Sequence, residues 1–190
     1  MTRRLLVGLV VAAIAMVMAV NASAFDGNRK GFVIGIGVGP SITSWTDEEG
    51  SWKSDRENDF GVGTIFKIGY GVNENLLIYY TNNVAWFSVG DGESFTVTSG
   101  ITALGGSYYL NTESPSLFIN GLVGIGVWAA PFESNSESAM GLGLGAGIGY
   151  EFSKHFNVNA TLMYGMPKFS DSEEKIKALN VLVTFNVLGY

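Results

Sequence analysis

Residues 140–152 read Met-Gly-Leu-Gly-Leu-Gly-Ala-Gly-Ile-Gly-Tyr-Glu-Phe, so every second residue from Met140 to Phe152 is apolar. The residues between them are glycines and Glu151. Because successive side chains of a strand point to opposite faces, this stretch predicts a strand with one apolar face and one face almost without side chains. It is longer than the roughly 9 to 11 residues with which a tilted strand crosses a bilayer.

Similar alternation recurs along the chain, and it predicts eight strands. The third, fourth and fifth carry large apolar residues on both faces, which leaves their orientation open and makes the fourth a candidate for a β-bulge. The eight segments are Gly31–Pro40, Phe60–Gly71, Leu76–Phe87, Ser94–Leu110, Ser116–Trp128, Met140–Phe152, Phe156–Tyr164 and Asn180–Val187.

The connections between these segments alternate in length. Three are short: Gly71–Asn75, Asn111–Pro115 and Ser153–His155. Four are mostly longer and polar: Ser41–Asp59, the stretch around Gly90–Glu93, Ala129–Ala139 and Gly165–Lys175. Short turns at one end and longer loops at the other are typical of transmembrane barrels, and only a closed sheet satisfies every backbone group in hydrocarbon. We therefore predict an all-β fold, an eight-stranded antiparallel up-and-down barrel with both mature termini in the periplasm and the loops outside.

Aromatic residues near the predicted strand ends suit two interfacial girdles. On the short-turn side they are Tyr70, Tyr108, Tyr150, Phe152 and Phe156, and on the other side Phe60, Trp86, Phe95 and Tyr164. A soluble barrel with an apolar interior is the alternative, since alternation alone does not say which face meets water. Glycine, asparagine and threonine on the opposite face supply too little bulk and polarity for a solvated surface.

The chain starts with the pattern of a secretory signal peptide. Arg3 and Arg4 precede an apolar run from Leu5 to Val20, and Asn21-Ala-Ser-Ala24 supplies small residues for cleavage. The run is short for a spanning helix of about 20 residues. We predict a signal peptide over residues 1–24, a mature start at Phe25 and one barrel domain over residues 25–190.

Charge and cysteine content exclude several classes of protein. Without residues 1–24, which contain two of the 11 basic residues, 9 remain against 17 acidic residues, and the formal charge is −8. Such a charge argues against a nucleic-acid partner. The chain has no cysteine, which excludes disulfides, thiolate metal sites and a cysteine nucleophile.

Four stretches carry a resemblance to a known family: Gly31–Gly39, Lys67–Gly71, Ser107–Leu110 and Gly147–Phe152. In them the chain resembles the outer-membrane β-barrel superfamily, in particular the small eight-stranded members typified by OmpX, OmpW and the OmpA membrane domain. The resemblance implies export to the outer membrane and contact with its lipid and lipopolysaccharide. No cofactor is expected, and we expect a monomer.

Members of this superfamily usually end in an aromatic residue preceded by alternating apolar residues, which the insertion machinery recognises. Tyr190 and Leu188 match that signal. Asn186 and Thr184 depart from it, because the apolar face of this strand runs through the odd-numbered residues.

One pair of charged residues is a candidate for an interior site. Lys67 and Glu151 fall on the inward register of the second and sixth strands, each near a short turn. Because a buried charge generally needs a partner, we predict an ion pair that closes this end of the lumen; two separately hydrated charges at the barrel mouth are the alternative.

Other candidate chemistry has ordinary explanations. His155, the only histidine, falls in a short turn beside Ser153 and lacks a matching catalytic or metal-ligand pattern. The glycines of 141–149 do not have a phosphate-loop spacing; they permit curvature, make room for bulky inward residues or leave a cavity. Acidic residues of the loops offer oxygen ligands to divalent cations or form a solvated surface. These are Asp47, Glu48, Glu49, Asp55, Glu57, Asp91, Glu93, Glu133, Glu137, Asp171, Glu173 and Glu174.

Three functional hypotheses follow. The first is a non-enzymatic outer-membrane protein that presents four extracellular loops for envelope structure, surface interaction or adhesion. The second is a conduit or binding site for small hydrophobic molecules. The third is a lipid-modifying barrel enzyme, for which the sequence shows no catalytic constellation.

Overall fold

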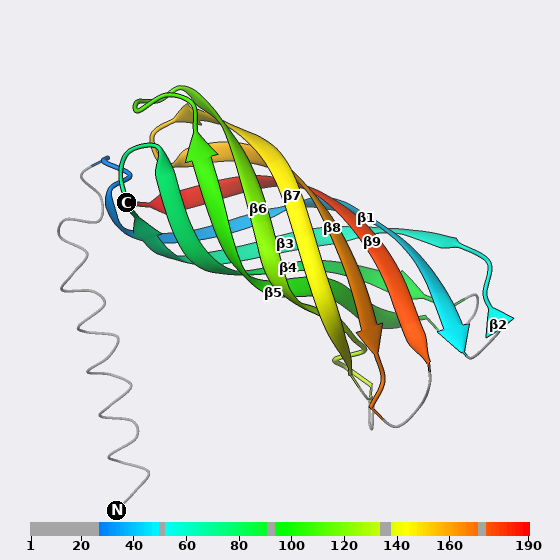
Figure 1. Ribbon diagram of the computed structural model, residues 1–190. Coiled ribbons are helices and arrows are strands. Elements are labelled where there is room, and N and C mark those ends of the chain that lie inside the picture. The colour runs from blue at the N-terminus through cyan, green and yellow to red at the C-terminus, as the bar shows by residue number, and fades with distance from the viewer. Residues whose placement is uncertain (1–26, 50–51, 91–93, 134–137, 171–173) are drawn as a thin grey trace, which may run out of the picture.

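The computed structural model describes residues 27–49, 52–90, 94–133, 138–170 and 174–190. The predicted signal peptide and the mature start at Phe25 lie outside these residues. The described part of the chain forms nine strands, shown in Figure 1. They are β1 (Gly31–Glu49), β2 (Trp52–Lys53), β3 (Glu57–Gly71), β4 (Leu76–Val89), β5 (Phe95–Tyr109), β6 (Ser116–Ala129), β7 (Ala139–Ser153), β8 (Phe156–Lys168) and β9 (Lys175–Gly189).

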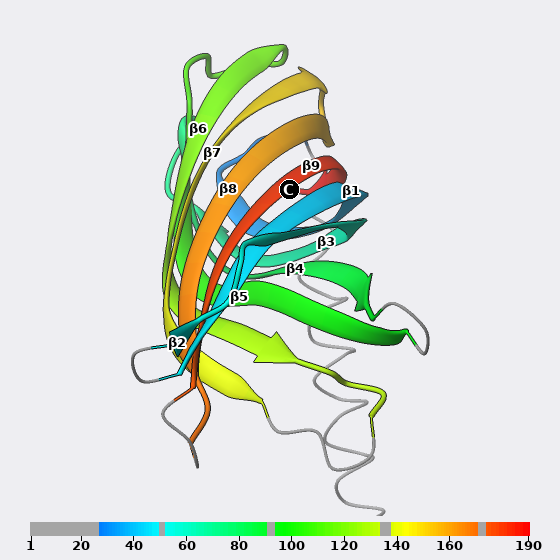
Figure 2. The same cartoon turned by 90° about the vertical axis from the view of Figure 1, so that its right-hand side faces the viewer.

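Eight of these strands close into a barrel. Consecutive long strands pair antiparallel from β1 through β3 to β9, and β9 pairs back with β1. Figure 2 shows β9 lying beside β1. β2 is a two-residue strand that pairs only with the end of β1. The predicted eight-stranded antiparallel barrel is confirmed.

The strands are longer than predicted at one end of the barrel. β1 continues past Pro40 to Glu49, and β3 begins at Glu57, so the predicted loop Ser41–Asp59 is largely strand. Similarly, the predicted loop Gly165–Lys175 starts only after Lys168. The cause is backbone pairing: Trp45 opposes Glu57 of β3 and Ala178 of β9, and such a ladder needs no apolar side chains beyond the bilayer.

We call the end of the barrel with the short connections 72–75, 110–115 and 154–155 the turn end, and the opposite end the loop end. The register shift of the barrel lies at the turn end, between Glu151 and Ser153. The pairings of β5 with β4 and β6 are regular, so the bulge considered for the fourth segment is wrong.

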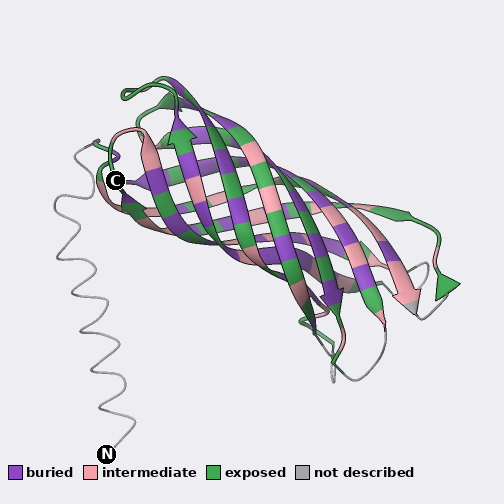
Figure 3. Ribbon diagram, in the orientation of Figure 1, coloured by how far each residue is buried: buried purple, intermediate pink, exposed green. Residues whose placement is uncertain are grey.

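The outer surface of the barrel is apolar. Exposed and buried residues alternate along the strands (Figure 3), and the exposed ones are aliphatic and aromatic, for example Ile36, Leu144 and Val183. Phe60 lies toward the loop end, and Tyr70 and Tyr108 lie toward the turn end, as predicted for two aromatic girdles. This apolar exterior is the reverse of a soluble barrel and fits hydrocarbon. The described residues contain no helix long and apolar enough to cross a membrane.

Candidate functional site

The turn end of the lumen is closed around the carboxylate of Glu151, which is fully buried near the end of β7. Arg29 donates to it from Nη2 at 2.5 Å and from Nε at 3.4 Å. The Tyr190 hydroxyl donates at 2.7 Å, and the Ser114 hydroxyl also donates to the carboxylate. We call Arg29, Ser114, Glu151 and Tyr190 the lock. Charge-assisted hydrogen bonds of this kind satisfy a carboxylate that has lost its water.

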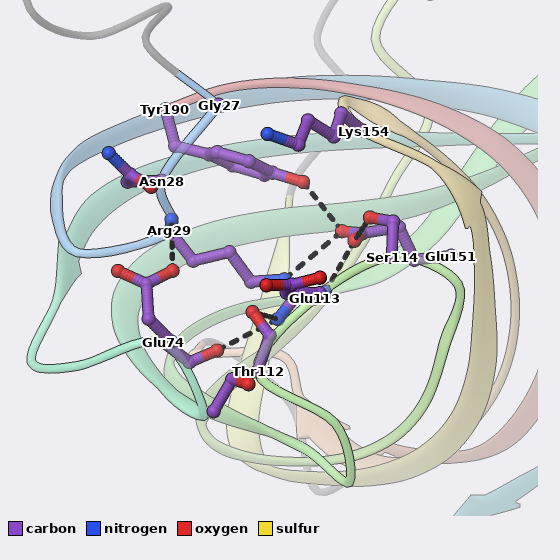
Figure 4. Close-up of a pocket in the computed structure, with 10 residues that line it drawn as sticks. All are labelled: Gly27, Asn28, Arg29, Glu74, Thr112, Glu113, Ser114, Glu151, Lys154 and Tyr190. Atoms are coloured by element: carbon purple, nitrogen blue, oxygen red, sulfur yellow. Dashed lines mark hydrogen bonds and ion pairs between the residues drawn. The ribbon is translucent and has the colours of Figure 1, made fainter.

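Arg29 connects the start of the barrel to two of its turns. Its Nη1 donates to the backbone carbonyls of Glu74, Asn111 and Thr112 at 2.9 to 3.0 Å, and its backbone N–H donates to the Glu74 carboxylate. Its guanidinium also lies over the Tyr109 ring, 4.1 Å from the ring centroid. Figure 4 shows the side chain extending from the N-terminal segment into this network. The lock therefore joins segments that are far apart in sequence.

The surroundings of the lock favour its charged form. Burial alone lowers the pKa of the Arg29 guanidinium, but the hydrogen bonds and negative charge of Glu151 outweigh it, and the pKa is raised above its ordinary value. Burial raises the pKa of the Tyr190 hydroxyl well above its ordinary value, and the Glu151 carboxylate raises it further. Arg29 is therefore a permanent cation, and Tyr190 keeps its proton to donate.

A polar pocket of about 370 Å³ lies against the lock at the turn end. Its lining combines lock residues with side chains of the turns, and Figure 4 shows all ten lining residues. They are Gly27, Asn28, Arg29, Glu74, Thr112, Glu113, Ser114, Glu151, Lys154 and Tyr190.

The predicted partner of Glu151 was wrong. Lys67 and Glu151 are both buried and inward-facing, as expected, but within the described residues no ion pair joins them. Arg29 takes the place of Lys67, whose ammonium lies over the Tyr79 ring at 4.8 Å from its centroid. Strand alternation cannot predict the role of Arg29, because this residue precedes β1 and inward register is defined only within a strand. The signal for it was a basic residue two positions before the first alternating segment.

Hydrogen bonds cross the middle of the lumen. Asn180 of β9 donates to the Ser99 hydroxyl of β5 at 3.0 Å, and these strands lie on opposite walls of the barrel. Asn180 also accepts from Thr43 of β1 at 2.8 Å. Nearer the turn end, Asn120 of β6 donates to Asn159 of β8 at 3.0 Å. Side chains from separate walls therefore meet inside, as expected of an eight-stranded barrel.

The inward glycines make room for bulky side chains of adjacent strands. A Cβ at Gly149 would overlap the ring of Phe118, its direct partner on β6. A Cβ at Gly35 would overlap Leu188, its partner on β9. By contrast, a Cβ at the outward-facing Gly121 would meet nothing. The packing role considered for the glycines is confirmed, with the neighbour strand as the main source of the bulk.

Aromatic side chains fill the loop end of the lumen. The rings of Trp45 and Trp128 lie 5.0 Å apart, and those of Phe87 and Trp128 lie 5.5 Å apart in an edge-on arrangement. We call these three residues the aromatic cluster. Ile176 is buried in the same apolar core, and Phe169 packs against that core. Trp45 satisfies its indole N–H by donating to Asp59 at 2.8 Å.

Leu188 and Tyr190, the predicted insertion signal, are both buried in the folded barrel. Leu188 lies over Gly35, and Tyr190 belongs to the lock. His155 holds the adjacent turn: it has a positive φ of 70°, its backbone N–H donates to the Tyr190 oxygen, and its ring lies against the Tyr190 ring. Recognition of these residues by the insertion machinery stays a prediction.

Among the described residues, no three histidine, aspartate or glutamate side chains lie close enough to share a metal ion. Glu48 of the predicted acidic loops instead pairs with Lys177 at 2.7 Å and Lys53 at 3.4 Å. Five acidic residues of these loops lie outside the described part of the chain: Asp91, Glu93, Glu137, Asp171 and Glu173.

A closed eight-stranded barrel with an apolar exterior, aromatic girdles and side chains that meet across its lumen defines an integral outer-membrane protein. The model of the outer membrane protein beta-barrel domain matches residues 12–187, and the chain belongs to this family. A search of curated protein sequences found no match.

Solved structures with the same fold are distant in sequence. Ail, the attachment invasion locus protein of Yersinia pestis, is 18% identical with a TM-score of 0.52, over 83% of this chain and 99% of Ail. OprG from Pseudomonas aeruginosa is 13% identical with a TM-score of 0.51, over 87% of this chain and 99% of OprG. Neisserial surface protein A is 14% identical with a TM-score of 0.50, over 83% of this chain and 97% of that protein.

Proposed function

We propose that this outer-membrane protein is a closed, non-enzymatic scaffold that presents its four loops at the cell surface. The observation that carries the proposal is the filled lumen: the lock occupies the turn end, the aromatic cluster occupies the loop end, and Asn180 reaches Ser99 across the middle. A barrel filled in this way has no interior path for a solute. Binding to a partner then falls to the loops, where binding residues of rigid scaffolds usually occur.

Presentation of the loops for attachment is the finer role that we propose. Ail carries attachment in its name and has the same fold, which is compatible with a loop-based surface role. The test shortens the connections at the loop end to tight turns and compares adhesion of cells that carry the shortened and the intact protein. Lost adhesion with a retained barrel supports the proposal, and unchanged adhesion contradicts it.

A conduit for small hydrophobic molecules is the alternative function. Liposomes that contain the purified protein and a dye that fluoresces when it meets a small hydrophobic compound distinguish the two. We expect uptake equal to that of protein-free liposomes. Faster uptake that depends on the protein would contradict the closed scaffold and support the conduit.

We further propose that the turn end faces the periplasm, after removal of residues 1–24 and insertion through the signal at Leu188 and Tyr190. The described connections at the turn end are the tight ones, which supports this orientation. An epitope inserted after Glu49 is expected to be labelled on intact cells. Labelling only after the outer membrane is broken would reverse the orientation.

A lipid-modifying activity has no support in the geometry of the only histidine. The His155 ring nitrogen Nδ1 lies 2.9 Å from the Leu188 carbonyl, inside a turn. We expect the lipid A and phospholipid profiles of cells that overproduce the protein to be unchanged; a protein-dependent change in either profile would contradict the non-enzymatic proposal.

A further inference from the structure

One part of the bilayer-facing surface is polar. Outward-facing Asn82 of β4 and Thr102 of β5 are direct cross-strand partners, and the Asn82 amide donates to the Thr102 hydroxyl at 2.8 Å. On the same face, Trp86 donates to the Thr64 hydroxyl at 2.9 Å. On this face of β4, Asn82 lies between Ile78, which opposes Tyr70 of the turn-end girdle, and Trp86 of the loop-end girdle, so it lies between the two aromatic girdles. We call Thr64, Asn82, Thr98, Gly100 and Thr102 the polar patch.

The opposite side of the barrel differs. Outward residues at the same depth on β7, β8 and β9 are aliphatic or aromatic throughout, for example Leu144, Leu162 and Val183. The polar patch is therefore a local feature of β3 to β5.

The polar patch has unused hydrogen-bonding capacity. Apart from the bond to Thr102, the Asn82 amide has a second N–H and a carbonyl oxygen with no partner among the described residues. Lipid tails offer no hydrogen bonds, and polar groups left unmatched in hydrocarbon are costly. A protein partner within the bilayer removes this cost.

The surface is also hollowed at the polar patch. A depression of about 120 Å³ lies over Gly100, which faces outward without a side chain. Its lining is completed by Asn82, Val84, Thr98, Ile101, Thr102 and Val127. The depression carries no charge and accepts an apolar side chain from a partner.

We infer that the polar patch is the interface between two copies of this chain in the outer membrane. All copies insert at the same depth and in the same orientation, so a two-fold axis along the membrane normal brings each Asn82 to the level of its counterpart. An amide both donates and accepts, and it can pair with an identical amide across such an axis. The sequence alone predicts a monomer. It leaves the orientation of the third and fourth segments open, because these segments carry large apolar residues on both faces.

Cysteine cross-linking tests this inference, because the chain has no native cysteine. Thr102→Cys is compared with Val183→Cys, which lies on the apolar side. Under mild oxidation in native outer membranes, we expect a disulfide-linked dimer of Thr102→Cys and at least about tenfold less of the control. Equal cross-linking of both variants, or none of Thr102→Cys, would overturn the dimer.

Energy transfer between labelled copies in vesicles provides a second readout. As the protein-to-lipid ratio rises, we expect the energy transfer to saturate, as it does when a dimer forms. Asn82→Leu should weaken dimerisation about tenfold, which is comparable to the loss of one or two hydrogen bonds between transmembrane helices. If the variant still resists unfolding in SDS without heating, its barrel is intact. Transfer no greater than random proximity, as when lipid alone fills the depression, would contradict the interface.

Discussion

The two ends of the lumen are closed by different kinds of interaction. At the turn end, one buried carboxylate receives hydrogen bonds from Arg29, Ser114 and Tyr190, and every bond depends on direction and charge. At the loop end, Trp45, Phe87 and Trp128 close the lumen through ring contacts that have no obligatory partner atoms. The lock should therefore fail when any single partner is lost, whereas the aromatic cluster should tolerate changes that preserve volume.

The largest effect is expected at the lock. Arg29→Met and Glu151→Gln each leave a buried group without its partner, and each should lower the free energy of unfolding by about 3 to 5 kcal/mol. The double variant should lose less than the sum, because the two residues act as one unit. Urea unfolding in lipid vesicles, followed by tryptophan fluorescence, measures this.

Glu113→Gln is the matched control for the lock, because Glu113 lines the same pocket but is exposed. Its free energy of unfolding should match that of the wild type. Small and additive effects of the two lock substitutions would show that the pair is hydrated and not locked.

A smaller and graded effect is expected in the aromatic cluster. Trp128→Ala leaves a cavity and should cost about 3 kcal/mol, whereas Trp128→Phe keeps an aromatic ring in place and should cost less than about 1.5 kcal/mol. The same unfolding assay compares them with Glu151→Asp, which keeps the charge of the lock but shortens its reach. The contrast between the ends is lost if Glu151→Asp is tolerated as well as Trp128→Phe.

The glycine packing predicts an effect of intermediate size. Gly149→Ala forces a methyl group against Phe118 and should cost about 1 to 3 kcal/mol. Gly121→Ala is the control, since its methyl group points outward into open space. Phe118→Leu should restore part of the stability of Gly149→Ala; absence of any such coupling would mean that the glycine serves curvature alone.

The smallest effect is expected at Lys67. Removal of its ammonium loses the contact with Tyr79, but it also removes the cost of burying a charge that has no carboxylate partner among the described residues. Lys67→Met should therefore change the free energy of unfolding by less than about 1 kcal/mol. A double-mutant cycle with Glu151→Gln should show no coupling, and coupling above about 1 kcal/mol would restore the ion pair expected from the sequence.

The alternation of residues 140–152 was sufficient to predict a membrane-crossing strand, because the two faces differ so sharply there. The extension of β1 over Ser41–Glu49 was not predicted, because backbone pairing, and not apolar periodicity, holds this part of the strand. The burial of Glu151 was predictable from its register. Its partner was not, because the side chains that meet in a lumen depend on the stagger of all eight strands and on a segment that precedes them.

The neighbours that form the outward-facing polar patch were also not predictable from the sequence. Asn82 and Thr102 come from separate strands, and they are adjacent because of the register between β4 and β5. The alternation in these two segments leaves open which face points outward, so it does not determine this register. The contribution of Arg29 likewise required the positions of turns 72–75 and 110–115 in space.

Ionic current through the purified wild-type protein in a planar lipid bilayer tests the closed lumen most directly. Because the lock, the cross-lumen hydrogen bonds and the aromatic cluster fill the interior, we predict no stable conductance above that of the protein-free bilayer. A reproducible unitary conductance of the wild-type protein would contradict the account.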